Sequence, residues 1–215
     1  DNHLIAVSKR PGDLVQGDKT GDKPLSEVVK SYIKTKYQKP GAVFLGVIHR
    51  LDRPTSGLVI FARTSKALSR MNALFAEGKT RKSYRAIVGC APDPPRGELV
   101  HYLQRNPKQN KSYAFRDPGK GRKRAVLSYE TVQVLDRYYL LDIDLQTGRH
   151  HQIRAQLAAI GCPIKGDLKY GAPRSNPDGS IHLHARQLEF IHPVRKTQVS
   201  LTAPYPGEAL WAACQ

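Results

Sequence analysis

Hydrophobic residues recur at helical spacing in some segments of the chain and at strand spacing in others. Helical periodicity predicts helices over residues 25–37, 65–76 and 150–160; Thr64 or Ser65 caps the second, and Gly161 stops the third. Apolar runs of strand length predict strands over residues 4–7, 43–48, 58–62, 84–88, 125–135, 138–146, 181–190 and 198–203. A short closing helix is predicted over residues 208–213. Because helices and strands mix without a strict β-α-β rhythm, the pattern predicts an α+β domain on a mixed sheet.

The polar segments between these elements are the candidates for chemistry and for binding. Residues 49–57 separate two predicted strands, so we expect a loop there, where functional residues are common. Residues 105–124 fit neither period, and we predict a polar loop for them as well. This second segment holds eight Lys and Arg residues against one Asp, a local net charge of 8 − 1 = +7.

The composition narrows the possible partners. The 215 residues include 35 Lys and Arg against 18 Asp and Glu, a formal net charge of +17. This excess favours nucleic acid, because basic surfaces bind it by neutralising phosphates. No apolar run approaches the roughly 20 residues that cross a bilayer, and no signal-peptide stretch is present, so neither a membrane span nor export is predicted. Cys90, Cys162 and Cys214 lack the spacing of a zinc ribbon or redox motif and favour a reducing, cytoplasmic location.

One acidic residue stands out within the predicted 49–57 loop. Asp52 lies between Arg50 and Arg53, so we expect its carboxylate to remain ionised, as a nucleophile or general base requires. An ordinary ion pair that stabilises the loop explains the same pattern. Spacing alone does not decide between these two interpretations.

Histidines mark two further clusters. In residues 147–154, which read TGRHHQIR, His150 and Arg154 are four residues apart and would share one face of a helix. That face could hold a carboxylate or phosphate from another segment, and the simpler alternative is contact with phosphate alone. His182 and His184 share one face of a predicted strand. No Cys or acidic residue stands near them at ligand spacing, so we interpret them as core or RNA-contacting residues rather than zinc ligands.

Five segments together resemble the RluA-type family of RNA pseudouridine synthases. They occur in the family's order and read HRLDRPTSG (49–57), KSYRA (82–86), TGRHHQIR (147–154), GCPIKGDLKYG (161–171) and LHARQLEFIHP (183–193). The joint occurrence of the first and third is far more specific than either alone. Two departures, Arg10 before Pro11 and Gln156 where relatives often have histidine, touch none of the residues to which a role is carried over.

The resemblance implies a pseudouridine synthase fold with an RNA-binding cleft. It implies isomerisation of uridine to pseudouridine, in rRNA or tRNA, without a cofactor or metal. By matching position, Asp52 resembles the essential aspartate, Tyr84 the tyrosine that stacks on the target base, and Arg154 the arginine that pairs with the aspartate. Arg50 resembles the arginine that fills the space left by the flipped nucleotide. The residues expected to contact RNA are Arg50, Arg53, Lys82, Lys123, Arg124, Arg149 and His150.

The sequence also bears on domain organisation and on two other functions. We expect a monomer with one catalytic domain over residues 1–215, without the S4-type RNA-binding domain that many relatives add. A catalytically inactive module of the same fold would bind RNA without turnover, but the joint presence of Asp52, Tyr84 and Arg154 favours an enzyme. A glycosidase or nucleotide hydrolase would need a second positioned acid. The acidic residues available for that role are Glu98, Asp142, Asp144 and Asp167. Structural roles suffice for Asp142 and Asp144 on a predicted strand and for Asp167 in a glycine turn, and no partner motif marks a second acid.

Overall fold

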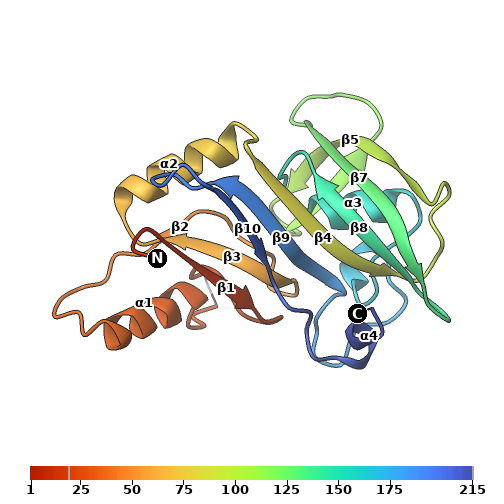
Figure 1. The fold of residues 1–215 in the computed structure, drawn as a ribbon. Helices are drawn as coiled ribbons and strands as arrows, with labels where there is room; N and C mark the ends of the chain where they lie inside the picture. The colour runs from red at the N-terminus through yellow and green to blue at the C-terminus, as the bar shows by residue number, and fades with distance from the viewer. Residues whose placement is uncertain (19, 215) are drawn as a thin grey trace.

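The elements of the chain alternate irregularly between strand and helix and form one continuous sheet (Figure 1). The computed structural model describes residues 1–18 and 20–214. In chain order the elements are β1 (Leu4–Lys9), α1 (Leu25–Lys36), β2 (Gly46–Val47), β3 (Ser56–Ala62), α2 (Ser65–Ala76), β4 (Thr80–Val88), β5 (Arg96–Asn106), β6 (Lys111–Phe115), β7 (Lys123–Val134), β8 (Tyr139–Leu145), α3 (Gln152–Ala159), the 3-10 helix η1 (Leu168–Tyr170), β9 (Leu183–Ile191), β10 (Gln198–Thr202) and α4 (Ala209–Ala212). The strand order is β1-β3-β9-β4-β8-β7-β5-β6, with β2 paired to β3 and β10 to β9. Among the described strands only β3 and β9 pair in parallel, so the predicted α+β class with a mixed, mostly antiparallel sheet is confirmed.

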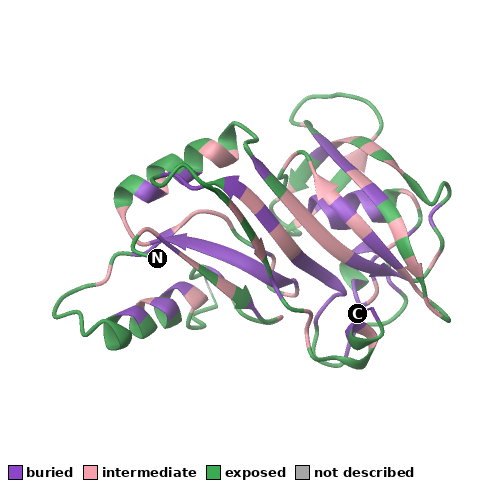
Figure 2. Ribbon diagram, in the orientation of Figure 1, coloured by how far each residue is buried: buried purple, intermediate pink, exposed green. Residues whose placement is uncertain are grey.

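Strand β3 is the buried axis of the N-terminal half. All of its residues are buried, as its uniform colour in Figure 2 shows. Neighbouring side chains of a strand point to opposite faces of the sheet. Ile60 therefore packs with Met71 of α2, whereas Phe61 packs with Ile33 of α1. The two helices cover opposite faces of β3.

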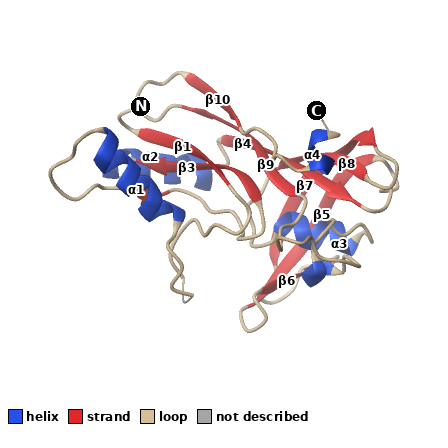
Figure 3. Ribbon diagram, turned by 90° about the horizontal axis from the view of Figure 1, so that it is seen from below, coloured by secondary structure: helices blue, strands red, loops and turns tan. Residues whose placement is uncertain are grey.

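The same alternation places helices on both faces of the C-terminal half. Ala86 of β4 belongs to the apolar cluster that contains Leu157 of α3, and its neighbour Ile87 packs with Trp211 of α4. Tyr84, two residues before Ala86, packs against the α3 cluster as well. Figure 3 shows α3 beside β5 and β6, with α1 and α2 at the other end of the sheet.

The predicted helices over residues 25–37 and 65–76 are confirmed as α1 and α2. The Thr64 hydroxyl caps α2 by accepting a hydrogen bond from the Ala67 N–H at 3.1 Å. These longest described helices have 12 residues each, which is too short to cross a bilayer. The predicted strand over residues 43–48 is too long, because only Gly46–Val47 pairs with β3 and Phe44 is exposed.

The prediction of a polar loop over residues 105–124 is wrong in part: residues 107–110 and 116–122 form turns and loops, but the rest of the segment belongs to strands. Strands β5 and β6 form an antiparallel hairpin that pairs Arg105 with Ser112, and β7 begins at Lys123. The hairpin turns at Asn110, whose φ of +45° lies in the left-handed region that asparagine tolerates. Because this hairpin projects at the end of the sheet with many polar side chains in water, hydrophobic periodicity gave no sign of it.

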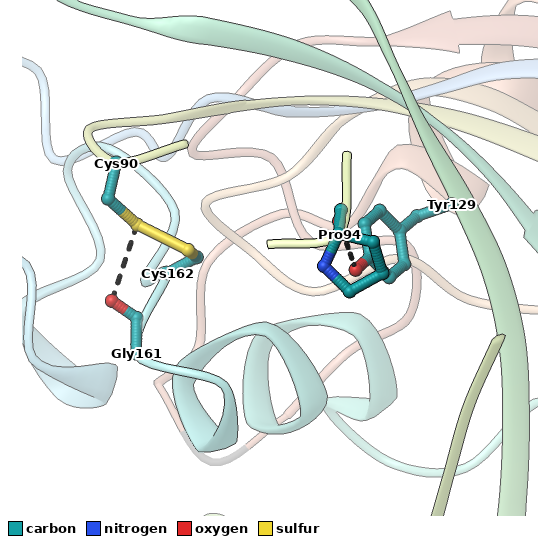
Figure 4. Close-up of a disulfide and its surroundings, with 5 residues drawn as sticks. All are labelled: Cys90, Pro94, Tyr129, Gly161 and Cys162. Atoms are coloured by element: carbon teal, nitrogen blue, oxygen red, sulfur yellow. Dashed lines mark hydrogen bonds between the residues drawn. A yellow bond between two sulfur atoms is a disulfide. The ribbon is translucent and has the colours of Figure 1, made fainter. Parts of the chain in front are cut away.

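Two of the three cysteines, which have no paired spacing along the chain, meet in the structure. Cys90 and Cys162 form a disulfide across a sequence separation of 72, with their Cα atoms 5.6 Å apart (Figure 4). An isolated antiparallel β-bridge between the backbones of Val88 and Ile164 brings the end of β4 beside the segment after α3. This pairing is tertiary, so cysteine spacing along the chain could not indicate it. Cys214 is free and buried.

Candidate active site

Asp52 lies in a loop whose backbone is tied to the N-terminal segment. Lys9 is 2% exposed, and its ammonium group donates to the backbone oxygens of Arg10, Arg53 and Thr55 at 2.8, 3.1 and 2.7 Å. The Thr55 N–H donates to the Asp52 carbonyl at 3.0 Å. These bonds fix the backbone around Asp52, while its side chain stays 29% exposed.

Gly57 allows this loop to enter the sheet at the right place. It pairs with Ala185 in the parallel contact between β3 and β9, and its φ is +115°. A Cβ atom at this position would lie 2.3 Å from the Ala185 carbonyl oxygen. Only glycine fits here, because any side chain would push the two strands apart.

Arg154 of α3 holds the Asp52 carboxylate. It is 5% exposed, and its Nη1 donates to Asp52 Oδ2 at 3.0 Å. Its Nε and Nη2 donate to both carboxylate oxygens of Asp167, at 2.6 and 2.8 Å. Burial alone would lower the pKa of Arg154, but its bonds and charge interactions with Asp167 and Asp52 raise it above its ordinary value. Arg154 therefore stays cationic and is oriented by two carboxylates at once.

His151, rather than His150, is the histidine beside this ion pair. The expectation that His150 and Arg154 share a helical face is wrong, because α3 begins at Gln152 and His151 has a φ of +53°. His151 is 8% exposed, and its Nε2 accepts from Arg154 Nη1 at 3.2 Å. Burial and the positive charge of Arg154 lower the pKa of His151 to about 2, so its ring is neutral.

Tyr84 faces the same cavity from β4. The cavity has a volume of about 90 Å³ and is bordered by Asp52, Tyr84 and Arg154 together with Arg50 and Arg149. Burial, reinforced by the charge of Asp52, raises the pKa of Tyr84 well above its ordinary value, so its hydroxyl stays protonated. Among the described residues that border the cavity, Asp52 is the only carboxylate. The arrangement offers one nucleophile or base beside a flat ring, without the second acid that hydrolysis of a glycoside uses.

The residues predicted to contact RNA are divided by the structure. Arg50 and Arg149 border the cavity. Arg53 does not, because its Nη2 donates to Asp22 at 2.7 Å on the outer side of the loop. Lys82 lies 5.8 Å from the centre of the Phe75 ring, outside the cavity lining.

The other three predicted contacts belong to the side of the cavity where the β5–β6 hairpin meets the sheet. Lys123 and Arg124 are exposed at the start of β7. Arg149 Nε donates to the Arg124 carbonyl at 3.1 Å, which joins the cavity rim to this strand. His150 contacts the hairpin itself, with Nδ1 2.8 Å from Ser112 Oγ and Nε2 3.2 Å from Asn110 Oδ1.

Sequence reasoning missed two parts of the site. His151 was passed over in favour of its neighbour, since only the left-handed backbone conformation reveals which ring faces Arg154. Asp167 was given a structural role in a glycine turn, and the structure makes that role specific: it anchors Arg154. The GDLKYG segment was the available signal, because it carries both Asp167 and Tyr170.

His182 and His184 are core residues, as expected. His182 is fully buried, stacks on Trp211 with ring centres 5.5 Å apart, and has Nε2 3.0 Å from Glu208. His184 Nδ1 lies 2.9 Å from Ser56 Oγ. Within the described residues, no three His, Cys, Asp or Glu side chains are grouped as a metal site would require.

Comparison with known proteins gives a consistent result. Residues 3–159 match the family described as RNA pseudouridylate synthase. The chain is 33% identical, over 97% of its length, to ribosomal large subunit pseudouridine synthase D of Zymomonas mobilis, and 31% identical, also over 97%, to the protein of the same name from Xylella fastidiosa. It spans 68% and 65% of those two relatives, and 53% of a Mycobacterium bovis relative named as an uncharacterized RNA pseudouridine synthase.

The fold is shared with solved structures. The human protein RNA Pseudouridylate Synthase Domain Containing 4 superposes with a TM-score of 0.80 at 24% identity, covering 96% of this chain and 87% of that one. Human RNA Pseudouridylate Synthase Domain Containing 1 superposes with a TM-score of 0.72 at 22% identity, covering 100% of this chain and 84% of that one. At these identities the likeness extends to the arrangement of the sheet and helices.

Proposed function

The chain belongs to the RluA-type RNA pseudouridylate synthase family, and from this premise we propose that it isomerises uridine to pseudouridine in RNA with Asp52 as its catalytic residue. The observation that carries the proposal is the contact between Asp52 Oδ2 and Arg154 Nη1 at 3.0 Å, beside Tyr84 in one cavity. An arginine held by a second carboxylate keeps Asp52 oriented for attack. The inactive RNA-binding module is the alternative that the experiment below separates.

The proposed reaction exchanges the bond from N1 to the sugar for a bond from C5 to the sugar, and exchanges the hydrogen on C5 for one on N1. A uridine must leave its stack before the enzyme can reach its glycosidic bond, and Tyr84 offers the flat surface that receives the base. Asp52 attacks the uracil or its ribose and the bond from N1 to C1′ of the sugar breaks. The bond that Asp52 formed breaks again as C5 bonds to C1′, which restores the carboxylate. C5 loses its hydrogen to solvent and N1 gains a proton. Because the pKa of Tyr84 is raised, Tyr84 serves as a neutral stacking partner rather than as a base.

The proposed substrate is large-subunit ribosomal RNA, with transfer RNA as the second class to test. Relatives named ribosomal large subunit pseudouridine synthase D support this choice. Arg50 and Arg149 are proposed to contact the flipped nucleotide, since they border the cavity. The remaining proposed RNA contacts, which lie outside the cavity lining and would meet the flanking strand, are Arg53, Lys82, Lys123, Arg124 and His150.

The proposal treats residues 1–215 as one catalytic unit that acts as a cytoplasmic monomer. The continuous sheet, which joins the clusters under α1, α2 and α3, supports one unit. Sedimentation and cell fractionation check these points, and recovery of the protein only as an oligomer or outside the cytoplasm would refute them.

The decisive experiment compares wild type with Asp52→Asn on RNA labelled with tritium at uracil C5. We expect wild type to release tritium and Asp52→Asn to lose about 1,000-fold or more of the rate, because the amide is no nucleophile. Asp22→Asn is the matched control, since Asp22 also pairs with an arginine of this loop, yet outside the cavity. Equal binding of RNA by all three proteins with no release by any would favour the inactive module.

A further inference from the structure

Tyr170 joins the β5–β6 hairpin to the catalytic ion pair through its hydroxyl. It ends η1 and is 8% exposed. Its Oη accepts from the Ser112 N–H at 2.9 Å and donates to the Ser112 carbonyl at 3.1 Å. The same oxygen lies 3.0 Å from His151 Nδ1. One hydroxyl therefore touches the hairpin on one side and the histidine beside Arg154 on the other.

Strand β6 needs this partner, because it is the last strand of the sheet. An edge strand leaves backbone N–H and C=O groups unpaired, and burying them without partners costs free energy. Ser112 is 2% exposed, and Tyr170 supplies both a donor and an acceptor to its backbone. Tyr170 thus acts where a further strand would otherwise pair.

The hydrogen positions in this network follow from the donors that have no choice. Arg154 can only donate, so His151 Nε2 must accept from it and carries no hydrogen. The neutral His151 ring then has its single hydrogen on Nδ1, which donates to Tyr170 Oη. Burial raises the pKa of Tyr170 to about 12, so its own hydrogen remains and is donated to the Ser112 carbonyl. Every donor in this hydrogen-bond network, which runs from Arg154 to Ser112 of β6, has an acceptor.

Other contacts draw the hairpin toward the same point. Lys111 Nζ lies 5.0 Å from the centre of the Tyr170 ring, and Arg154 lies 5.1 Å from it on the catalytic side. Lys169, the residue before Tyr170, donates to the backbone oxygens of Gln109 and Asn110 in the hairpin turn at 3.3 and 3.2 Å. The hairpin is therefore held to the catalytic centre through η1 and also through His150, which bonds Ser112 Oγ and stacks on His151 with ring centres 3.8 Å apart. The hydroxyl of Tyr170 is the link that bonds both the Ser112 backbone and the His151 ring.

We propose that Tyr170, acting through His151, is a positioning residue that keeps the hairpin in register with the Asp52–Arg154 pair. This inference rests on the proposed function, in which basic residues beside the hairpin hold the RNA strand. Tyr170 does not border the cavity and so acts through its neighbours. Its hydroxyl selects the His151 tautomer that accepts from Arg154, and the same hydroxyl fixes β6. Without the hydroxyl, Nδ1–H would lose its acceptor, and the other tautomer could direct its Nε2–H to Asp52 Oδ2, 3.5 Å away, in competition with Arg154.

The kinetic test uses Tyr170→Phe, which keeps the ring and its contacts with Lys111 and Arg154. Tyr113→Phe is the matched control. Tyr113 follows Ser112 on β6 and is exposed, and its hydroxyl bonds only Gln109 among the described residues. We expect Tyr170→Phe to lower the single-turnover rate of tritium release about tenfold, with the Kd for RNA changed less than about threefold. Tyr113→Phe should stay within about twofold on both. Equal rates for the two variants would overturn the proposal.

A spectroscopic measurement tests the network without RNA, and its wild-type arm needs no variant. In protein labelled with ¹⁵N histidine, correlation of the ring nitrogens with the carbon-bound ring protons shows which nitrogen carries hydrogen. We expect His151 of the wild type to be protonated on Nδ1 alone, and Tyr170→Phe to gain the Nε2–H form while Tyr113→Phe does not. A wild-type His151 protonated on Nε2 would overturn the proposal even if Tyr170→Phe failed to fold. Absence of tritium release by wild type, with the expected tautomer present, would instead refute the proposed function.

Discussion

Two cationic regions of this protein are built in opposite ways. Arg154 is 5% exposed and donates to Asp52, His151 and Asp167, so its position is fixed from three sides. Lys123 and Arg124, at the start of β7, are exposed, and neither forms an ion pair with another described residue. A charge that must orient one carboxylate is paired in advance, whereas charges that meet a phosphate chain are left unpaired. The difference predicts different responses to mutation, acid and salt.

The largest expected effect comes from removing the anchor of Arg154. Asp167→Asn leaves a buried guanidinium with one carboxylate fewer, so we expect the free energy of unfolding to fall by about 3–5 kcal/mol and the rate of tritium release to fall at least about tenfold. Asp142→Asn is the matched control: Asp142 pairs with Arg85 at 3.3 Å, and its side chain is 40% exposed. There the change should stay below about 1 kcal/mol. Urea unfolding measures the loss of unfolding free energy in both variants. Similar losses would refute the expectation that the buried Arg154 pair matters more than the half-exposed Arg85 pair.

Acid should lower the free energy of unfolding through the buried histidines, one of which, His151, contacts Arg154. Burial lowers the pKa of His184 to about 4 and contributes to lowering that of His151 to about 2, both from 6.5. Between pH 6.5 and 4 the unfolded chain therefore binds more protons than the folded one, and stability falls as the pH falls.

His184→Asn tests this pH dependence, because Asn keeps a partner for Ser56 Oγ and cannot titrate. From pH 6.5 to 4.5 we expect wild type to lose roughly 2 kcal/mol more stability than His184→Asn, measured by urea unfolding at each pH. His150→Asn should reduce this acid-induced loss of stability by less than His184→Asn does, since the His150 ring is only partly buried and water already solvates part of it. A wild-type stability that does not decline over this range would refute the expectation.

The parts of the fold that sequence could predict are those governed by local rules. Helix α2 was predicted with its bounds, because its apolar spacing, the Thr64 cap and Gly78 all agree. Strand β3 was recognised from its unbroken apolar run, which reflects burial on both faces. The β5–β6 hairpin was missed because its exposed strands carry no hydrophobic alternation strong enough to outweigh their charge.

The candidate site divides in the same way. The pairing of Asp52 with Arg154 was expected only from the resemblance, since 102 residues separate them and no spacing rule connects them. The helical rule that joined His150 to Arg154 failed because the helix begins two residues later, after the left-handed His151. The Tyr170 contacts depend on how η1 meets an edge strand, which is a tertiary arrangement without a local signature.

The smallest expected effect concerns the exposed charges at the start of β7. Lys123→Ala with Arg124→Ala should weaken RNA binding about tenfold at moderate salt and leave the single-turnover rate at saturating RNA within about twofold. If both side chains contact phosphates, the slope of log K against log salt should become less steep by about 1.4 to 1.8. Each phosphate contact releases about 0.7 to 0.9 counterions on binding, and the variant loses two such contacts. Lys34→Ala with Lys39→Ala removes two exposed charges near the end of α1 and should change the slope much less, since α1 lies at the other end of the sheet. Equal slopes for the two double variants would mean that RNA senses only the net charge. A rate loss at saturation would place these residues with the Arg154 network, and the contrast between oriented and free cations would not hold.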